Sequence, residues 1–324
     1  KGVLTGFGIT SIVQSSSVTT VMTVSFVNAG LMTLVQSAGV MMGANIGTSI
    51  TNTLVSLGHI GDKNEFKRAF AAATIHDFFN LLSVIIFLPL EILFHPLERM
   101  SLFLAQNFYG GGSLSIKDLN FVKAATKPIV NLFKEVTHIL PAPFDGLALI
   151  ALGIGLIFLT IAFIGTLLKA LMVGRAKDIL HTAIGKGPIA GIAAGTFMTI
   201  LVQSSSTTTS LMVPLAGSGV FGLAEIYPFT LGANIGTCVT ALLAATAVSG
   251  AEAIPALEIA LVHLLYNTLG VIVIYGIPFL CRLPVLCAET LAAVSSERKY
   301  IGFAYVIGVF FVIPGILLGA SYIF

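Results

Sequence analysis

The chain has 324 residues, of which 56% are apolar and only 9% are charged, and its formal net charge is +2. A soluble globular protein of this length needs more polar residues to cover its surface, so the composition excludes that class and predicts a protein embedded in a bilayer. Basic residues are few and scattered, which argues against nucleic-acid binding. The three cysteines are too few for a disulfide framework, and we expect free thiols.

Two sequence motifs occur twice along the chain. Gln-Ser-Ser-Ser begins at Gln14 and again at Gln203, and Gly-Ala-Asn-Ile-Gly-Thr begins at Gly43 and again at Gly232. Both pairs are separated by 189 residues. Two unrelated motifs at the same separation indicate that a whole structural unit is duplicated.

Residues 1–95 predict a hairpin, a broken helix and a spanning helix. The apolar stretches Gly2–Val13 and Val18–Val27 are only about half as long as the ~20 residues that cross a bilayer, so we interpret them as arms of a re-entrant hairpin. Gln-Ser-Ser-Ser forms its tip. The glycines of the second motif predict an unwound point in the next transmembrane helix. Ala69–Phe94 is long enough to span the bilayer.

The middle of the chain is predicted to connect two copies of this unit. Residues 96–145 are mixed in composition and predict an extramembrane linker with short amphipathic helices. Residues 146–187 predict a connecting transmembrane helix, Gly146–Val173, followed by a cytoplasmic loop.

Residues 188–324 predict the second copy, with its own hairpin and broken helix. The next predicted span is Glu258–Leu280. A loop containing Arg282 and Arg298 is then expected before a last span from Tyr300 to Phe324.

The basic residues of the short loops predict the orientation of the two units. Lys63, Lys67 and Arg68 place their loop on the cytoplasmic side, and counting spans from there makes the two units enter the bilayer from opposite sides. The predicted fold is therefore an all-α polytopic membrane protein. It consists of two inverted-topology repeats, each with a re-entrant helical hairpin and a broken transmembrane helix.

The hairpin tips carry hydroxyl groups next to a helix start. Free N–H groups and the partial positive charge of a helix N-terminus favour an oxyanion there. Neutral hydroxyl donors suit an anion that must be released again. The alternative is that these side chains only satisfy the backbone or pack helices together, but two runs at matched positions favour binding. The candidate ligands are Ser15, Ser16, Ser17, Ser204, Ser205 and Ser206.

Further polar residues lie at the predicted helix breaks and in one span. Oxygen atoms at an unwound backbone can replace the hydration shell of a small hard cation. The alternative is that Asn45 and Asn234 cap the broken helix ends. Asp77 is the only carboxylate in the interior of a predicted span, away from its ends, and such a group indicates a functional site. We interpret the neighbouring His76 as a packing residue or a structural partner of Asp77.

These residues resemble a known transporter family. The segments Met42–Thr53, Arg68–Ala71 and Thr74–Asn80 are similar to the pattern of the type II sodium-dependent phosphate cotransporter family, whose bacterial and animal members carry duplicated Gln-Ser-Ser-Ser motifs. The resemblance covers both repeats but not the linker. It implies symport of inorganic phosphate with Na⁺ by alternating access, in a bacterial member of the family.

The resemblance also implies a division of the site residues. Phosphate is expected between the two serine runs, with Asn45 and Asn234 beside them. The matching of Ala71, Ala73 and Asp77 to the family's electrogenic members implies that transport moves net charge. The resemblance links Gln14, Asp77, Asn80, Thr237 and Thr240 to sodium. To these we add Thr48 and Thr51 at the predicted helix break, and Gln203 as the counterpart of Gln14.

The expected partners are therefore phosphate, Na⁺ as the coupling ion and the lipid bilayer, without an organic cofactor or nucleic acid. The implied location is the bacterial inner membrane, where the chain is a multi-pass protein, and the sequence leaves a homodimer open. A symporter of another oxyanion, sulfate or a dicarboxylate, would use the same architecture. A channel is a further alternative. An intramembrane serine hydrolase is not favoured, because no Gly-x-Ser-x-Gly elbow is present and we expect no enzyme activity.

Overall fold

The computed structural model describes residues 1–110, 121–141, 144–149, 151–153, 155–156, 184–246, 248 and 253–323. Within these ranges the chain forms helices and no strands. The helices before residue 111 are α1 (Gly2–Val13), α2 (Ser16–Asn28), α3 (Leu34–Thr48), α4 (Ile50–Ser56), α5 (Lys63–Phe94) and α6 (Pro96–Gly110). They are followed by α7 (Phe121–Thr137), α10 (Pro188–Val202), α11 (Ser205–Ser210), α12 (Met212–Gly217), α13 (Leu223–Thr246), α14 (Ala253–Gly270), α15 (Pro278–Glu297), α16 (Lys299–Ile307) and α17 (Ile313–Ile323).

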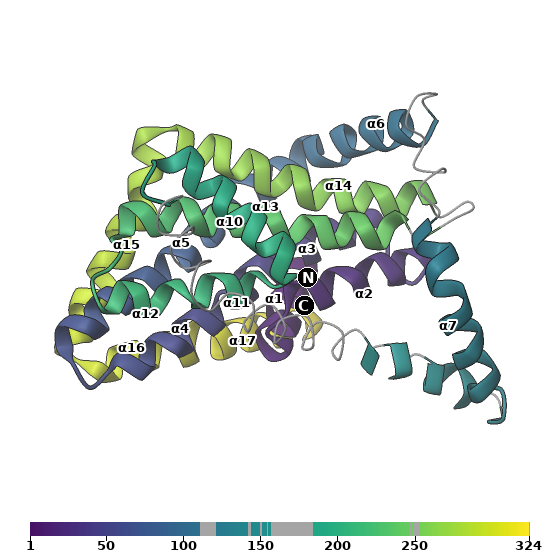
Figure 1. Cartoon of the computed structure of the whole chain (residues 1–324), viewed down its shortest axis with the longest axis horizontal. Helices are drawn as coiled ribbons and strands as arrows, with labels where there is room; N and C mark the ends of the chain where they lie inside the picture. The colour runs from purple at the N-terminus through teal and green to yellow at the C-terminus, as the bar shows by residue number, and fades with distance from the viewer. Residues whose placement is uncertain are drawn as a thin grey trace.

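Five helical stretches of the described chain are long and apolar enough to cross a bilayer. They are Lys63–Phe94, Leu223–Thr246, Ala253–Tyr275, Pro278–Glu297 and Lys299–Ser321. Two of them include short π-helical segments, Val271–Tyr275 and Gly308–Val312. In Figure 1, α13 and α14 run along the long axis of the molecule. The predicted class, an all-α polytopic membrane protein, agrees with these helices.

The two predicted hairpins have the same local structure. In each, an apolar helix ends at a glutamine in the left-handed region, Gln14 with φ 55° and Gln203 with φ 54°. The next residue, Ser15 or Ser204, is extended and its hydroxyl accepts a hydrogen bond from the first turn of the following helix. A left-handed residue reverses the chain and a serine N-cap starts the next helix, so the tip sequence fixes the turn.

The predicted helix break at the second motif is wrong in the second copy, and in the first copy it lies one residue beyond the motif. Gly232 to Thr237 lies inside the continuous helix α13, and in the first copy the interruption falls only after the motif, at Ser49, whose backbone remains helical (φ −74°, ψ −13°). The glycines serve close helix contacts instead. A Cβ atom on Gly43 would lie 1.9 Å from the carbonyl oxygen of Val3, and one on Gly232 would lie 2.0 Å from that of Ile192. Small residues of this kind allow α1 to pack on α3 and α10 on α13.

The predicted loop containing Arg282 and Arg298 is also wrong, because most of it is helix α15. The helix carries small residues four positions apart, Pro284, Ala288 and Ala292, which are buried. This stripe allows α15 to pack closely against α5.

Other predictions for the middle region can be compared with the structure only over the described residues. Helices α6 and α7 lie in the predicted linker, and α6 packs against α14. The predicted span Gly146–Val173 and the loop that follows it lie mostly outside the described residues. The repeat boundaries at residues 95 and 188 remain predictions.

Helix α5 begins at a capped turn in the loop after α4. The Asp62 carboxylate accepts hydrogen bonds from the backbone N–H groups of Glu65 (2.9 Å) and Asn64 (2.8 Å). These bonds, that of Glu65 first, hold the pKa of Asp62 below its ordinary value of 3.8. Because the folded-state pKa is lowered, the cap stabilises the helix start above the ordinary pKa and loses this effect as the pH falls through the lowered value.

Candidate functional site

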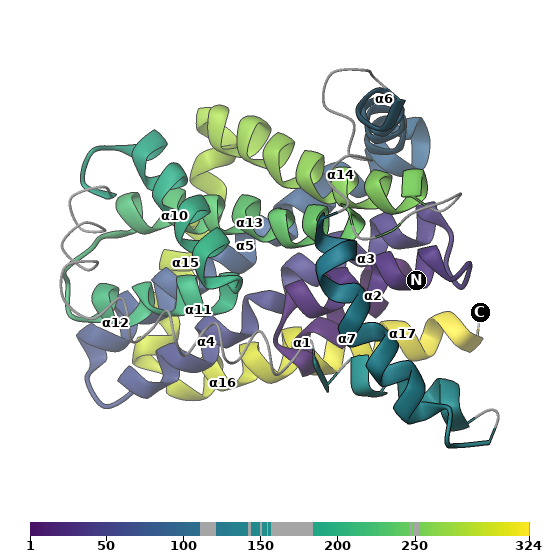
Figure 2. The same cartoon turned by 45° about the vertical axis from the view of Figure 1, so that its right-hand side comes forward.

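The two hairpin tips meet, as the sequence predicted. The Ser17 hydroxyl donates to the carbonyl oxygen of Gln203 (3.3 Å), and the Ser206 hydroxyl donates to that of Gln14 (3.4 Å). The contact is therefore reciprocal between equivalent atoms of the two copies. Figures 1 and 2 show the halves interleaved, with α11 of the second half beside α4 of the first.

The six serines divide into two kinds by their hydrogen bonds. Ser15 and Ser204 are helix caps, which accept from the N–H groups of Val18 (3.3 Å) and Thr207 (3.2 Å). The inner serines are buried, with Ser16 and Ser205 each only 3% exposed. The four inner serines are Ser16, Ser17, Ser205 and Ser206. They supply neutral donors at the junction of the tips, together with the N-terminal N–H groups of α2.

The second motif belongs to a different set of contacts. The Asn45 amide donates to Asn267 Oδ1 (2.6 Å), and His263 Nε2 donates to Asn45 Oδ1 (3.2 Å). His263 and Asn267 lie four residues apart on α14, so one helix of the second half holds the asparagine of the first. All three side chains are buried.

The same arrangement occurs with the halves exchanged. The Asn234 amide donates to Asn80 Oδ1 (2.8 Å), and His76 Nε2 donates to Asn234 Oδ1 (2.8 Å). Asn80 also donates to the backbone carbonyl of Asn45 (2.8 Å), which links the two sets. We refer to Asn45, His76, Asn80, Asn234, His263 and Asn267 as the asparagine network.

The asparagine network changes the expected role of three residues. Both side-chain ends of Asn45, Asn234 and Asn80 are used inside it. The structure therefore does not bring Asn45 or Asn234 into hydrogen bonds with the serines. His76 was interpreted as a packing residue or a partner of Asp77; it and His263 are buried, and their ring nitrogens hold the asparagines by hydrogen bonds. The i, i+4 spacing of His and Asn in both halves was the available signal.

Asp77 occupies a buried polar position between three elements. Its Oδ2 atom accepts hydrogen bonds from Tyr305 Oη (2.9 Å) and Thr53 Oγ1 (3.2 Å). Its Oδ1 atom is buried and has no hydrogen-bond partner within the described chain. His76 does not pair with it, because both of its ring nitrogens contact asparagines, Asn234 and Asn52.

The other predicted sodium residues do not form one cluster. Thr240 Oγ1 donates to Gln203 Oε1 (2.7 Å), so this pair is in contact. Thr48 and Thr237 donate back to their own helices, to the carbonyls of Ala44 (2.8 Å) and Ala233 (3.0 Å). The two that remain are Thr51, whose hydroxyl is buried without a partner in the described chain, and Gln14, which is exposed.

Comparison with known proteins identifies the family. The family model described as Na⁺/Pi-cotransporter matches residues 1–110 and 156–279. The chain belongs to the Na⁺/Pi-cotransporter family. No solved structure matches the chain significantly.

Curated relatives of this Na⁺/Pi-cotransporter family member are sodium-dependent phosphate transport proteins of animals. Protein 2B of Homo sapiens and that of Pongo abelii are each 34% identical over 405 residues, covering 99% of the chain and 58% of the relative. Protein 2A of Ovis aries is 31% identical over 389 residues, covering 99% and 60%. The chain thus spans about three fifths of the length of these relatives.

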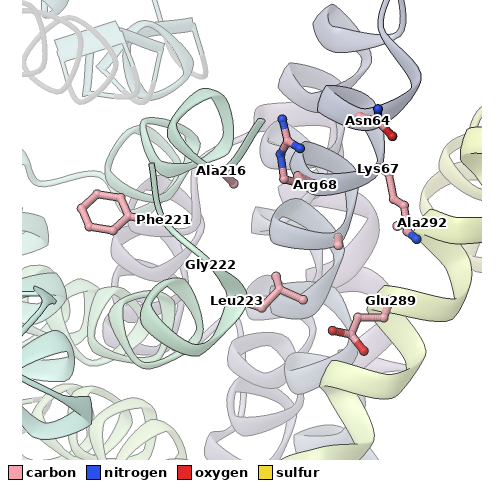
Figure 3. A pocket seen from close by; sticks show the side chains of 10 residues that line it. Asn64, Lys67, Arg68, Ala216, Phe221, Gly222, Leu223, Glu289 and Ala292 are labelled. Atoms are coloured by element: carbon pink, nitrogen blue, oxygen red, sulfur yellow. The ribbon is translucent and has the colours of Figure 1, made fainter. Parts of the chain in front are cut away.

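This Na⁺/Pi-cotransporter family member also has a cavity of about 310 Å³ away from the tip residues. Figure 3 shows Lys67 and Arg68 on α5, with Glu289 and Ala292 on α15 across the cavity. The Arg68 guanidinium donates through Nε (2.9 Å) and Nη2 (2.6 Å) to the carbonyl of Gly217, at the end of α12. Arg68 therefore ties the far end of the second hairpin to α5.

Replacing Arg68 by alanine should destabilise the protein. The substitution removes two charge-assisted hydrogen bonds to a helix end, and we expect the apparent Tm in detergent to fall by roughly 2–6 °C. Lys67→Ala is the matched control, since Lys67 lies in the same cavity and makes no hydrogen bond to the described chain. Equal Tm values for the two variants would contradict a tethering role of Arg68.

Proposed function

We propose that the protein is a secondary active transporter that couples the uptake of inorganic phosphate to Na⁺ by alternating access. Family membership and the names of the relatives support phosphate and sodium as the transported species. The observation that carries the proposal is the reciprocal contact of the two tips, in which the Ser17 hydroxyl donates to the Gln203 carbonyl and the Ser206 hydroxyl donates to the Gln14 carbonyl. One small anion between equivalent hydroxyls would contact both halves at once, as transporters built from repeats require.

The membrane arrangement proposed for this function is a pair of inverted repeats with re-entrant hairpins. The matched hairpin turns, the glycine contacts of α1 with α3 and of α10 with α13, and the basic residues around Lys63 support it. A continuous α13 is compatible with this arrangement, because the hairpin tips and not a broken helix then supply the irregular backbone at membrane depth.

The proposed phosphate ligands are the four inner serines with the N-terminal N–H groups of α2. Sodium is proposed at buried oxygen atoms near the tips and on α5. The contact of Thr240 with Gln203 gathers two oxygens, and the unpartnered Thr51 Oγ1 and Asp77 Oδ1 are further candidate ligands. Small hard cations prefer oxygen ligands of this kind.

Uptake by liposomes containing the purified protein tests the function. We expect labelled phosphate to accumulate above the external concentration when Na⁺ is high outside, and not when choline replaces Na⁺. Excess arsenate should compete because it shares the shape and charge of phosphate, whereas sulfate should compete poorly. Accumulation of sulfate in preference to phosphate would assign the protein to another oxyanion. Flux that never runs uphill would indicate a channel.

Removing one inner serine hydroxyl at either tip should weaken phosphate binding. Ser16→Ala and Ser205→Ala should each raise the apparent KM for phosphate about 5- to 150-fold, which corresponds to the about 1–3 kcal/mol cost of a lost partner to a charged group. Ser25→Ala is the control, because this exposed serine on α2 only donates to the Val21 carbonyl. An unchanged KM in both tip variants would contradict a site between the tips.

A further inference from the structure

One asparagine outside the asparagine network joins it to the second hairpin. Asn52 on α4 donates from Nδ2 to His76 Nδ1 (3.4 Å), and its Oδ1 atom accepts from Thr209 Oγ1 on α11 (2.9 Å). The side chain is only 1% exposed. Its amide therefore bridges a histidine of α5 and a threonine directly behind the tip serines.

The duplicated half lacks this amide. The counterpart of Asn52, 189 residues on, is Ala241, and the counterpart of Thr209 is Thr20. The histidine matching His76 is His263, with a separation of 187 residues. Both groups that an amide at position 241 would bridge, Thr20 Oγ1 and His263 Nδ1, are buried and have no hydrogen-bond partner within the described chain. Thr20 and His263 are each 0% exposed.

The three helices that carry these positions pack together. Ala241 of α13 lies in one hydrophobic cluster with Val24 of α2 and Ala260 of α14. Thr20 is one helical turn from Val24, and His263 is about one turn from Ala260. By the duplication, residue 241 corresponds to Asn52 between the matching helices, and its alanine side chain is smaller than asparagine by the carboxamide group.

The required hydrogen-bonding pattern defines the ligand. His263 Nε2 donates to Asn45 Oδ1, so the remaining Nδ1 atom is an acceptor. Thr20 can donate its hydroxyl hydrogen, as Thr209 does to Asn52. A ligand in this place must donate to a nitrogen and accept from a hydroxyl, which an anion without an O–H group cannot do, and Na⁺ prefers oxygen to nitrogen ligands.

We propose that a single water molecule binds between Thr20 and His263, in the position that the Asn52 amide takes in the first half. A buried water needs polar partners, and Thr20 and His263 offer one donor and one acceptor. This water completes a hydrogen-bonded chain that runs from Thr209 through Asn52 and the asparagine network to Thr20. One hairpin is thus joined to the network by a fixed side chain and the other by an exchangeable molecule.

Supplying the missing amide tests the site. Ala241→Asn should displace the water, satisfy both groups and raise the apparent Tm of the full chain in detergent by roughly 2–4 °C. Ala241→Val fills similar space without hydrogen bonds and should lower the Tm. In a Thr20→Val background the gain from Ala241→Asn should shrink by half or more, since one of its two partners is gone. A Tm lowered equally by Asn and Val would overturn the proposal.

Two further measurements test the site without relying on a rise in the Tm of Ala241→Asn. In wild-type protein labelled at histidine, water-edited solid-state NMR should transfer magnetisation from a bound water to His263 Nδ1 but not to His76 Nδ1, which an amide covers. Absence of transfer to His263 would contradict a water site. The Tm of the wild-type protein should also be the same in NaCl as in choline chloride. The same should hold for Ala241→Asn. A rise specific to Na⁺ that Ala241→Asn removes would assign an ion instead.

Discussion

Replacing Asp77 by glycine should abolish the current that accompanies phosphate uptake while Na⁺-dependent uptake itself continues. Asp77 Oδ1 is buried and has no partner in the described chain, and Oδ2 is held only by the neutral hydroxyls of Tyr305 and Thr53. A charged carboxylate at membrane depth costs several kcal/mol unless a cation accompanies it. We therefore expect Asp77 to recruit one Na⁺ beyond those that balance phosphate.

An uncompensated positive charge couples the cycle to the membrane potential at about 2.3 kcal/mol per 100 mV. Uptake by the wild-type protein should then accelerate when the interior is made negative with a K⁺ gradient and valinomycin, and uptake by Asp77→Gly should not. Asp62→Asn, which removes an exposed carboxylate at the start of the same helix, should leave the potential dependence unchanged. A persistent current in Asp77→Gly would show that the carboxylate serves only the packing of Tyr305 and Thr53.

The second large effect concerns a single methyl group on α1. A Cβ atom on Gly6 would lie 2.1 Å from the backbone carbonyl oxygen of Val40 on α3, and a backbone atom cannot move aside as a flexible side chain can. Gly6→Ala should therefore force the hairpin away from α3. We expect the apparent Tm to fall by on the order of 5–10 °C, since overpacking a tight contact costs about 3 kcal/mol.

Gly8 provides the matched control on the same helix. No atom lies within 4 Å of a Cβ built on Gly8, so Gly8→Ala should leave the Tm unchanged or raise it slightly through better helix propensity. Gly195→Ala in the second half should repeat the Gly6 result, because its Cβ would lie 2.0 Å from the Phe229 carbonyl oxygen. Equal stability of the Gly6 and Gly8 variants would contradict the tight crossing of α1 and α3.

The hairpins could be predicted from sequence because their signals are local. The predicted arm Gly2–Val13 coincides with helix α1. The helix ends at Gln14, the first residue of the predicted tip. Helix α15 could not be found in the same way, since Arg282 and Arg298 suggested a loop and its buried stripe depends on contact with α5. The glycines at Gly43 and Gly232 allow either an unwound backbone or a close helix contact, and only the neighbouring helix decides between these.

The candidate site shows the same limit. The matching tips and their predicted opposite orientation indicated that the serine runs would meet, and Ser17 and Ser206 each contact the opposite tip. The partners of Asn45 could not be predicted, because His263 and Asn267 are more than 200 residues away and their contact depends on how the halves interleave. Asp77 was found because an acid in an apolar span is unusual in any fold.

The crossed hydrogen bonds of the asparagine network have a consequence for how such a chain is made and how it arose. While the first half is synthesised, the side chains of Asn45, His76 and Asn80 lack their partners on α13 and α14, because these helices do not yet exist. The first half alone is therefore expected to be an incomplete folding unit. An ancestral single copy would have had the same defect, which a second identical copy could cure. The two halves now differ at this point, with asparagine at position 52 and alanine at position 241.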